Sequence, residues 1–155
     1  MTTLRRHALP RALLASAALT AVASCAGEGI VDPVAPPPAC TDVAPFRPQF
    51  SCIQQLVFTP TCALAGCHAA PGASQGLVLS EGVAYGMLVG VPSTETSTGQ
   101  IRVSPGDPDN SYLIVKLEGT DSRLVGDRMP FGGPYLSQAE IDVIRQWILD
   151  GAPPD

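Results

Sequence analysis

The sequence has few charged and few aromatic residues, and this scarcity excludes one class of function. Of its 155 residues, 15% are charged and 5% aromatic, and Lys116 is the only lysine. Three of the nine basic residues, Arg5, Arg6 and Arg11, lie at the N-terminus, whereas all fourteen acidic residues lie from Glu28 onward. Binding to a phosphate backbone needs clustered lysine and arginine. The sequence therefore excludes nucleic-acid binding.

The N-terminal apolar run is too short to cross a membrane. Residues 12–23 form a run of about twelve residues, whereas a transmembrane helix needs roughly 20. Arginines precede the run and small residues end it, which is the pattern of a secretory signal. The residues Val22-Ala23-Ser24-Cys25 resemble a bacterial lipobox, whose cysteine is lipidated and becomes the first residue of the mature protein. We therefore predict a lipoprotein signal peptide over residues 1–24 and lipidation of Cys25, with ordinary cleavage near Ala23–Ala26 as the alternative.

A proline-rich segment without apolar periodicity follows the signal. Six prolines lie between positions 33 and 48, and such sequence favours extended, semi-rigid conformations. We interpret residues 25–45 as a tether, with an unstructured leader as the alternative, and residues 46–155 as the folded domain. Ala26 stands where an aspartate often retains lipoproteins in the inner membrane. The sequence thus favours a periplasmic domain whose lipid anchor lies in the outer membrane.

Lipidation of Cys25 leaves an even number of cysteines, four of the five. Export places them in an oxidising compartment, where thiols pair unless another group occupies them. The spacing of Cys40 and Cys52 suits a disulfide that ties the tether to the first helix. A zinc site built from Cys40, Cys52, Cys62 and Cys67 is disfavoured by the oxidising compartment and by the irregular spacing.

The most informative segment is Cys62-Ala63-Leu64-Ala65-Gly66-Cys67-His68. Covalent haem attachment uses two thiols that capture the vinyl groups of the porphyrin and a following histidine that ligates the iron, usually spaced C-x-x-C-H. Here the spacing is C-x4-C-H, and the small residues Ala63, Ala65 and Gly66 suit the bulged loop that two extra residues require. The same two cysteines could instead close a small structural disulfide. The motif alone leaves both interpretations open.

The remaining ligand candidates are few. His68 is the only histidine left after removal of the signal peptide, because His7 is lost with it; this excludes ligation of a haem by two histidines and a Cys2His2 zinc site. A haem with one histidine most often takes a methionine as its second ligand. Met87 falls at apolar helical spacing and is interpreted as a core residue. Met129 lies in a loop rich in glycine and proline, where a soft thioether suits an iron ligand; a methionine capping the core is the alternative.

Apolar periodicity predicts helices and no strand. The first helix is expected over residues 50–58 and is ended by Pro60. A second is expected over residues 80–90 with Ser80 as N-cap, and a third over residues 111–117 with Asp109 or Asn110 as N-cap. The last has a capping box at residues 137–140, Gly151 as C-cap, and an apolar stripe of Ile141, Ile144, Trp147 and Ile148. We therefore predict a small all-α domain with long loops.

The order of these features resembles the class I c-type cytochromes. A helix, the segment CALAGCH, the segment RMPFGG and a final helix follow one another as in that family, over about residues 50–153. The likeness is greatest to small exported bacterial cytochrome c-like domains with a C-x4-C-H motif. The resemblance implies one covalent haem c, an imidazole oriented by the Pro71 carbonyl, thioethers at Cys62 and Cys67, and axial ligation by His68 and Met129.

Ligation from both sides leaves the iron without an open position, so the resemblance implies a mono-haem carrier of single electrons and not an enzyme. No paired carboxylates, nucleophile–base pair or phosphate-binding loop in the sequence indicates an enzyme. The acidic surface predicts redox partner proteins with a basic docking patch. The alternative is a haem-free, lipid-anchored binding or structural module on a cytochrome-like scaffold, with Cys62 and Cys67 joined in a disulfide.

Overall fold

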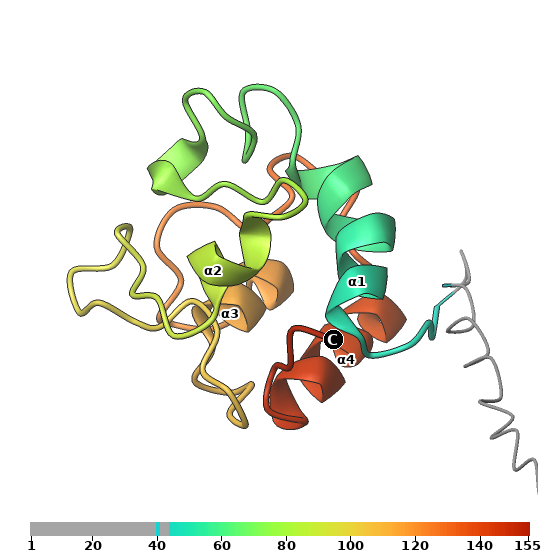
Figure 1. Cartoon of the computed structure of the whole chain (residues 1–155). Helices are drawn as coiled ribbons and strands as arrows, with labels where there is room; N and C mark the ends of the chain where they lie inside the picture. The colour runs from blue at the N-terminus through green and yellow to red at the C-terminus, as the bar shows by residue number, and fades with distance from the viewer. Residues whose placement is uncertain (1–39, 41–43) are drawn as a thin grey trace, which may run out of the picture. The chain divides into compact units, whose positions relative to one another are not determined.

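The computed structural model describes Cys40 and residues 44–155, and this part of the chain is helical (Figure 1). Its elements are α1 (Phe50–Ile53), the π-helical η1 (Gln54–Cys62), the 3-10 turn η2 (Ser74–Gly76), α2 (Ala84–Leu88), α3 (Tyr112–Glu118) and α4 (Gln138–Leu149). No strand occurs among the described residues, which contain only two isolated bridges, Val89 to Val103 and Pro92 to Ile101. The predicted helical class is therefore confirmed. The predicted signal peptide, Cys25 and most of the tether lie outside the described residues.

None of the helices in the described part of the chain has the length and hydropathy needed to cross a bilayer.

α1 and η1 form one continuous helix that carries the chain to Cys62. The sequence predicts that Pro60 ends this helix, and the prediction is wrong because Pro60 lies inside η1. In an α-helix the proline ring meets the carbonyl four residues earlier, whereas the wider π-helical turn separates the two groups. A hydrogen bond from the Ala63 N–H to the Phe58 carbonyl (2.7 Å) closes the last turn. Cys62 is therefore positioned by a helix end and not by a free loop.

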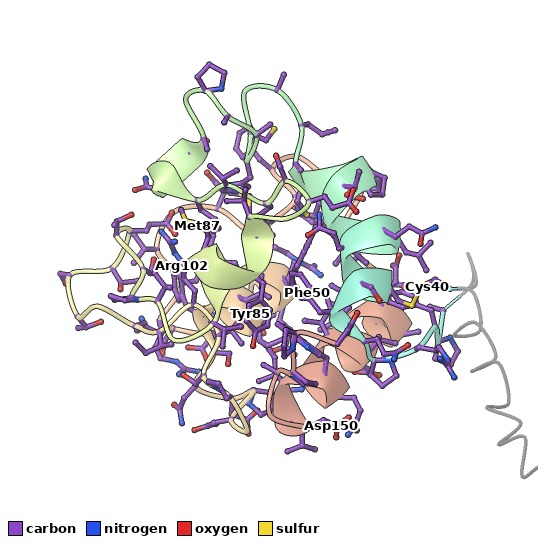
Figure 2. The ribbon with its side chains drawn as sticks, viewed as in Figure 1. Cys40, Phe50, Tyr85, Met87, Arg102 and Asp150 are labelled. Atoms are coloured by element: carbon purple, nitrogen blue, oxygen red, sulfur yellow. A yellow bond between two sulfur atoms is a disulfide. The ribbon has the colours of Figure 1, made fainter. Side chains whose placement is uncertain are left out.

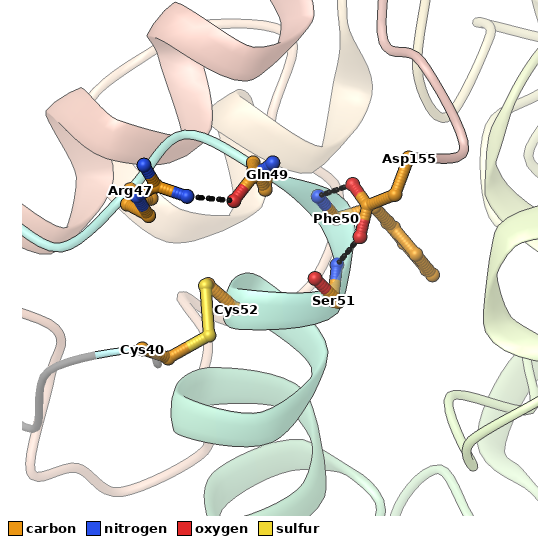
Figure 3. Close-up of a disulfide and its surroundings, with 7 residues drawn as sticks. All are labelled: Cys40, Arg47, Gln49, Phe50, Ser51, Cys52 and Asp155. Carbon is orange, nitrogen blue, oxygen red and sulfur yellow. Dashed lines mark hydrogen bonds between the residues drawn. A yellow bond between two sulfur atoms is a disulfide. The ribbon is translucent and has the colours of Figure 1, made fainter. Parts of the chain in front are cut away.

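Two distant parts of the chain hold the beginning of α1 (Figure 3). Cys40 and Cys52 form a disulfide across this segment. The Asp155 carboxylate accepts hydrogen bonds from the N–H groups of Phe50 and Ser51, both at 2.7 Å. These N–H groups have no partner within the helix, and a negative charge is favourable at this end of a helix. Asp155 therefore acts as the cap of α1.

We expect Asp155→Ala to lower the free energy of unfolding by about 1–2 kcal/mol, because it removes the acceptor of two helix N–H groups and its charge. Urea denaturation followed by far-UV circular dichroism at pH 7 measures this loss. Asp127→Ala, at an exposed loop position, is the matched control and should change stability by less than about 0.5 kcal/mol. Equal stability of the two variants would contradict the capping role.

The core surrounds an aromatic cluster formed by α1, η1, α2 and α4. Phe50 packs edge-on against Phe58 and Tyr85, with ring centres 6.2 and 5.2 Å apart, and its ring centre lies 5.4 Å from that of Trp147. Figure 2 shows Phe50 and Tyr85 next to each other. Trp147 is fully buried, and its Nε1–H donates to the Pro153 carbonyl (2.9 Å). The chain after α4 is thereby fastened to the core.

α4 begins at the predicted capping box and ends one position from the predicted cap. The Ser137 Oγ accepts from the Glu140 N–H (3.3 Å), and the Glu140 carboxylate accepts from the Ser137 N–H (2.7 Å), which completes the capping box. The predicted apolar stripe is buried. Asp150 is the C-cap, and Gly151 follows it with a φ of +97°. Hydrogen bonds from the N–H groups of Gly151 and Ala152 to the last turn make this end a Schellman motif, whose cap Asp150 lies one position before the predicted Gly151.

α2 is shorter than the sequence predicts, which changes the interpretation of Met87. The helix begins at Ala84, after a turn that starts at Ser80. Gly82 in that turn has a φ of +76°, a left-handed conformation that a right-handed helix cannot include. Leu88 is fully buried, but Met87 is only half-buried and lies outside the core cluster. The predicted core role of Met87 is therefore wrong.

The N-cap of α3 also differs from the prediction. Ser111 occupies the cap position, and neither Asp109 nor Asn110 does. Asp109 instead forms an ion pair with Arg145 of α4. Asn110 donates to Asp107 from its N–H (3.2 Å) and from its side-chain amide (2.8 Å). Other contacts thus occupy the two side chains that the local pattern assigned to capping.

Candidate functional site: a cavity lined by Cys62, His68 and Met129

Three of the four residues that the sequence predicts to bind haem line one cavity. Cys62, His68 and Met129 all contribute to its wall, whereas Cys67 does not. The cavity measures about 210 Å³, which is below the roughly 300–1,000 Å³ of sites for small molecules and cofactors. Most of the exposed wall is apolar, and its apolar residues include Phe58, Leu77, Leu79, Leu88, Leu113 and Leu117. The wall is suited to contact with a mainly apolar molecule.

Backbone hydrogen bonds close the loop between Cys62 and His68. The His68 N–H donates to the Cys62 carbonyl (3.1 Å), and the Cys67 N–H donates to the Leu64 carbonyl (2.9 Å). Gly66, inside the second of these turns, has a φ of +80°, a conformation that favours glycine. The extra residues of the C-x4-C-H spacing are thus accommodated in a tight turn. This turn brings His68 back to the end of η1 and leaves Cys67 exposed.

The imidazole of His68 is oriented by a backbone carbonyl. Its Nδ1 lies 3.0 Å from the carbonyl oxygen of Leu77, and the His68 carbonyl accepts from the Leu79 N–H (2.8 Å). Because a carbonyl can only accept, Nδ1 carries the proton in this bond and Nε2 keeps its lone pair, as in histidines that ligate a metal. The orienting carbonyl is that of Leu77, so the expectation that Pro71 supplies it is wrong.

Met129 lies in the loop between α3 and α4, and its backbone is fixed to α3. The Met129 N–H donates to the Lys116 carbonyl (2.8 Å). Met129 is half-buried, lies outside the core cluster and lines the cavity. The structure therefore places this thioether in the same cavity wall as the His68 imidazole, where it is available to a ligand.

A partly buried ion pair in the cavity wall is not predicted by the sequence. The Lys116 ammonium lies 3.0 Å from the Glu95 carboxylate and donates to the Val125 carbonyl (2.9 Å). The Tyr112 hydroxyl donates to the same carboxylate (3.1 Å). The only sequence signal was a single lysine between Val115 and Leu117 of an apolar helix. This network joins three separate segments of the chain at one side of the cavity.

Arg102 is a second cavity residue that the sequence does not single out. It is 6% exposed, and its guanidinium donates to the carbonyls of Met87 (2.8 Å) and Gln75 (3.3 Å). Burial lowers the pKa of this guanidinium below its ordinary value. Among the described residues Arg102 forms no ion pair, whereas Lys116 and Glu95 neutralise each other. The cavity therefore contains one buried positive charge without a carboxylate partner.

The Cys62 thiol is strongly disfavoured from ionising. Burial, and secondarily the nearby Cys67, raise the pKa of Cys62 to about 12. Cysteines that act as nucleophiles or redox catalysts have lowered pKa values and partial exposure. Cys62 therefore lacks the electrostatics of a catalytic thiol.

We expect the two thiols of the haem-free protein to react with iodoacetamide at very different rates. With a pKa of about 12, only about one Cys62 in ten thousand is a thiolate at pH 8. Cys67 is exposed, so it should be alkylated at least about tenfold faster. The rate at Cys62 should rise with pH across pH 8–10, because ionisation is far from complete there. Mass spectrometry of timed samples measures both rates, and equal rates at pH 8 would contradict the burial of Cys62.

The arrangement of the cysteines bears on two alternatives to haem binding, the zinc site and the disulfide between Cys62 and Cys67. Cys40 and Cys52 are bonded to each other and so are unavailable to zinc. No group of three or more His, Cys, Asp or Glu residues that could hold a metal ion occurs within residues 44–155 or at Cys40. Cys62 and Cys67 are free thiols in this structure, not a disulfide.

No protein-family model, no curated protein and no solved structure matches the chain. The functional conclusion therefore depends on the cavity and on the residues that line it.

Proposed function

We propose that residues 46–155 form a class I cytochrome c-like domain that binds one haem c covalently and carries single electrons. The observation that supports this best is the meeting of Cys62, His68 and Met129 in the wall of one mainly apolar cavity. Packing alone does not require a thiol, an imidazole and a thioether at one place. The carbonyl of Leu77, which fixes the tautomer of His68, adds a feature that a ligand histidine needs.

The cavity residues fit the chemistry of haem. Cys62 in the wall and Cys67 on the exposed turn that follows it would form the thioethers, and His68 and Met129 in the wall would ligate the iron. Bound haem supplies an iron atom that alternates between the ferric and ferrous states. Haem is an apolar disc with two carboxylates at one edge, and the apolar wall and the unpaired guanidinium of Arg102 match those two parts. The Leu77 carbonyl would keep the proton on Nδ1 of His68, and the leucines would exclude water.

The proposal includes the location and partners that the sequence implies. The domain would be held in the periplasm by a lipid on Cys25, with the anchor in the outer membrane. Residues 44–155 contain eleven acidic and six basic side chains, so a redox partner with a basic patch would be attracted in a salt-dependent manner. Held by both His68 and Met129, the haem would exchange electrons and would not transform a substrate.

The test is a pyridine haemochrome spectrum together with haem staining on a denaturing gel. The full chain should be exported from a host that has cytochrome c maturation machinery. We expect a c-type spectrum and a stained band, and loss of the band in the double variant Cys62→Ser/Cys67→Ser. The single variant Cys25→Ser is the control, because it changes the predicted lipidation site and leaves both attachment thiols in place.

Absence of haem from the unaltered protein, with Cys62 and Cys67 joined in a disulfide, would refute the proposal. The haem-free binding or structural module would then be the better interpretation.

A further inference from the structure

Met129 begins a short loop whose two ends are joined by their side chains. The loop is Met129-Pro130-Phe131-Gly132-Gly133-Pro134. Arg128 precedes it, and Tyr135 follows it. The guanidinium carbon of Arg128 lies 4.1 Å from the centre of the Tyr135 ring. A cation over the face of an aromatic ring is attracted by the ring's negative face. This contact holds together the two residues that flank the loop containing Met129.

The same arginine fixes the loop to the end of α3. The Arg128 Nε–H donates to the Leu117 carbonyl (2.7 Å), and the Met129 N–H donates to the Lys116 carbonyl (2.8 Å). Carbonyls in the last turn of a helix have no partner within the helix, and a positive charge is favourable there. Two successive residues of the loop therefore bond to two successive carbonyls of α3.

The C-cap glycine of α3 provides the room that Arg128 needs. Gly119 has a φ of +72°, and a Cβ built on it would lie 2.5–2.8 Å from the Arg128 side chain. No side chain other than hydrogen fits at this position while Arg128 keeps its place. The stem of Arg128 thus lies directly across the end of α3, and the position of this side chain is set by close packing as well as by hydrogen bonding.

We infer that Arg128 is a positioning residue that holds the Met129 thioether in the cavity as the iron ligand, with Tyr135 as its support. The inference rests on the proposed haem-binding function. Arg128 is not a wall residue of the cavity, so its effect on the iron passes through Met129. Removal of the Arg128 side chain deletes its contacts with Tyr135 and with the Leu117 carbonyl. The hydrogen bond from the Met129 N–H to the Lys116 carbonyl then remains to hold the loop against α3.

The experiment measures competition between Met129 and added imidazole in the oxidised holoprotein. Arg128→Ala should raise the apparent affinity for imidazole by about tenfold, because one hydrogen bond and one cation–π contact no longer favour the closed loop. Tyr135→Leu, which removes the ring, should shift the affinity in the same direction by a smaller factor. Tyr135→Phe keeps the ring face and should behave as the unaltered protein.

Arg145→Ala is the control for a purely structural effect. Arg145 pairs with Asp109 and Glu118 and so supports the packing of α3 against α4 without touching the Met129 loop. This variant should unfold at a lower urea concentration and keep the imidazole affinity of the unaltered protein. Arg128→Lys, which keeps the charge but has no planar group or Nε–H, should resemble Arg128→Ala if fixed geometry is what matters.

Two different failures can be told apart. An unaltered protein with haem and a methionine-to-iron charge-transfer band, but with the same imidazole affinity after Arg128→Ala, would overturn the positioning role alone. An unaltered protein without haem, or with haem but without that band, would overturn the proposed axial ligation and this inference with it.

Discussion

Replacement of Met129 with alanine should abolish the methionine-to-iron charge-transfer band of the oxidised protein while the haem stays covalently attached. Met129 lines the cavity together with His68, and its backbone is fixed to Lys116 of α3. Without the thioether, the proposed site would keep His68 as its one ligand of the iron. The reduction potential should fall, because a methionine ligand raises it. Visible spectroscopy of the oxidised protein and a potentiometric titration measure the two effects.

The chain offers a matched control in Met87. It is half-buried, and its side chain does not line the cavity. Figure 2 shows Met87 near Arg102, and the contact between them uses the Met87 carbonyl, which alanine retains. Met87→Ala should therefore leave the charge-transfer band and the potential unchanged. Loss of the band in Met87→Ala, or its survival in Met129→Ala, would show that Met129 is not the iron ligand.

The parts of the fold that the sequence predicts well depend on neighbours along the chain. The capping box of α4 needs only Ser137 and Glu140, three positions apart, and both form it. Pro60 shows the limit of such local rules, because the chain continues past it in a π-helical turn. The cap of α1 shows the same limit, since the Asp155 carboxylate reaches Phe50 across 105 positions. No local pattern carries information over that separation.

The residues of the candidate site likewise fall into two groups, those identified from the local sequence and those whose partners are distant in the sequence. The segment 62–68 is identified because its thiols and imidazole are close in sequence, and Met129 because a large apolar side chain in a loop of glycine and proline has no packing role there. Arg102 and Lys116 are not identified, because each sits in an apolar stretch and its partners come from elsewhere. Glu95, for example, lies 21 positions from the lysine it neutralises. Their role at the cavity is visible only after the loops are folded.

Trp147→Ala should lower the free energy of unfolding by about 3–5 kcal/mol, the usual effect of deleting a large buried aromatic side chain. Trp147 is fully buried, packs against Phe50 and donates to the Pro153 carbonyl. The change leaves a cavity between α1 and α4 and an unpaired carbonyl in the chain that follows α4. Since the stability of a small domain is about 5–15 kcal/mol, the variant should be close to unfolding. Urea denaturation must be followed by circular dichroism, because Trp147 is the only tryptophan.

Leu149→Ala on the same helix separates burial from a general effect on α4. Leu149 is 56% exposed, so its removal should change stability by less than about 0.5 kcal/mol; similar losses in both variants would refute the assigned core.

The effect of Trp147→Ala should also extend to the alkylation rate of Cys62. Trp147 packs against Phe50, the first residue of the helix that ends at Cys62. Trp147 also donates to the Pro153 carbonyl, two positions before Asp155, which caps the same helix. More frequent opening should therefore speed the alkylation of Cys62 in the haem-free variant, while the rate at the exposed Cys67 stays the same.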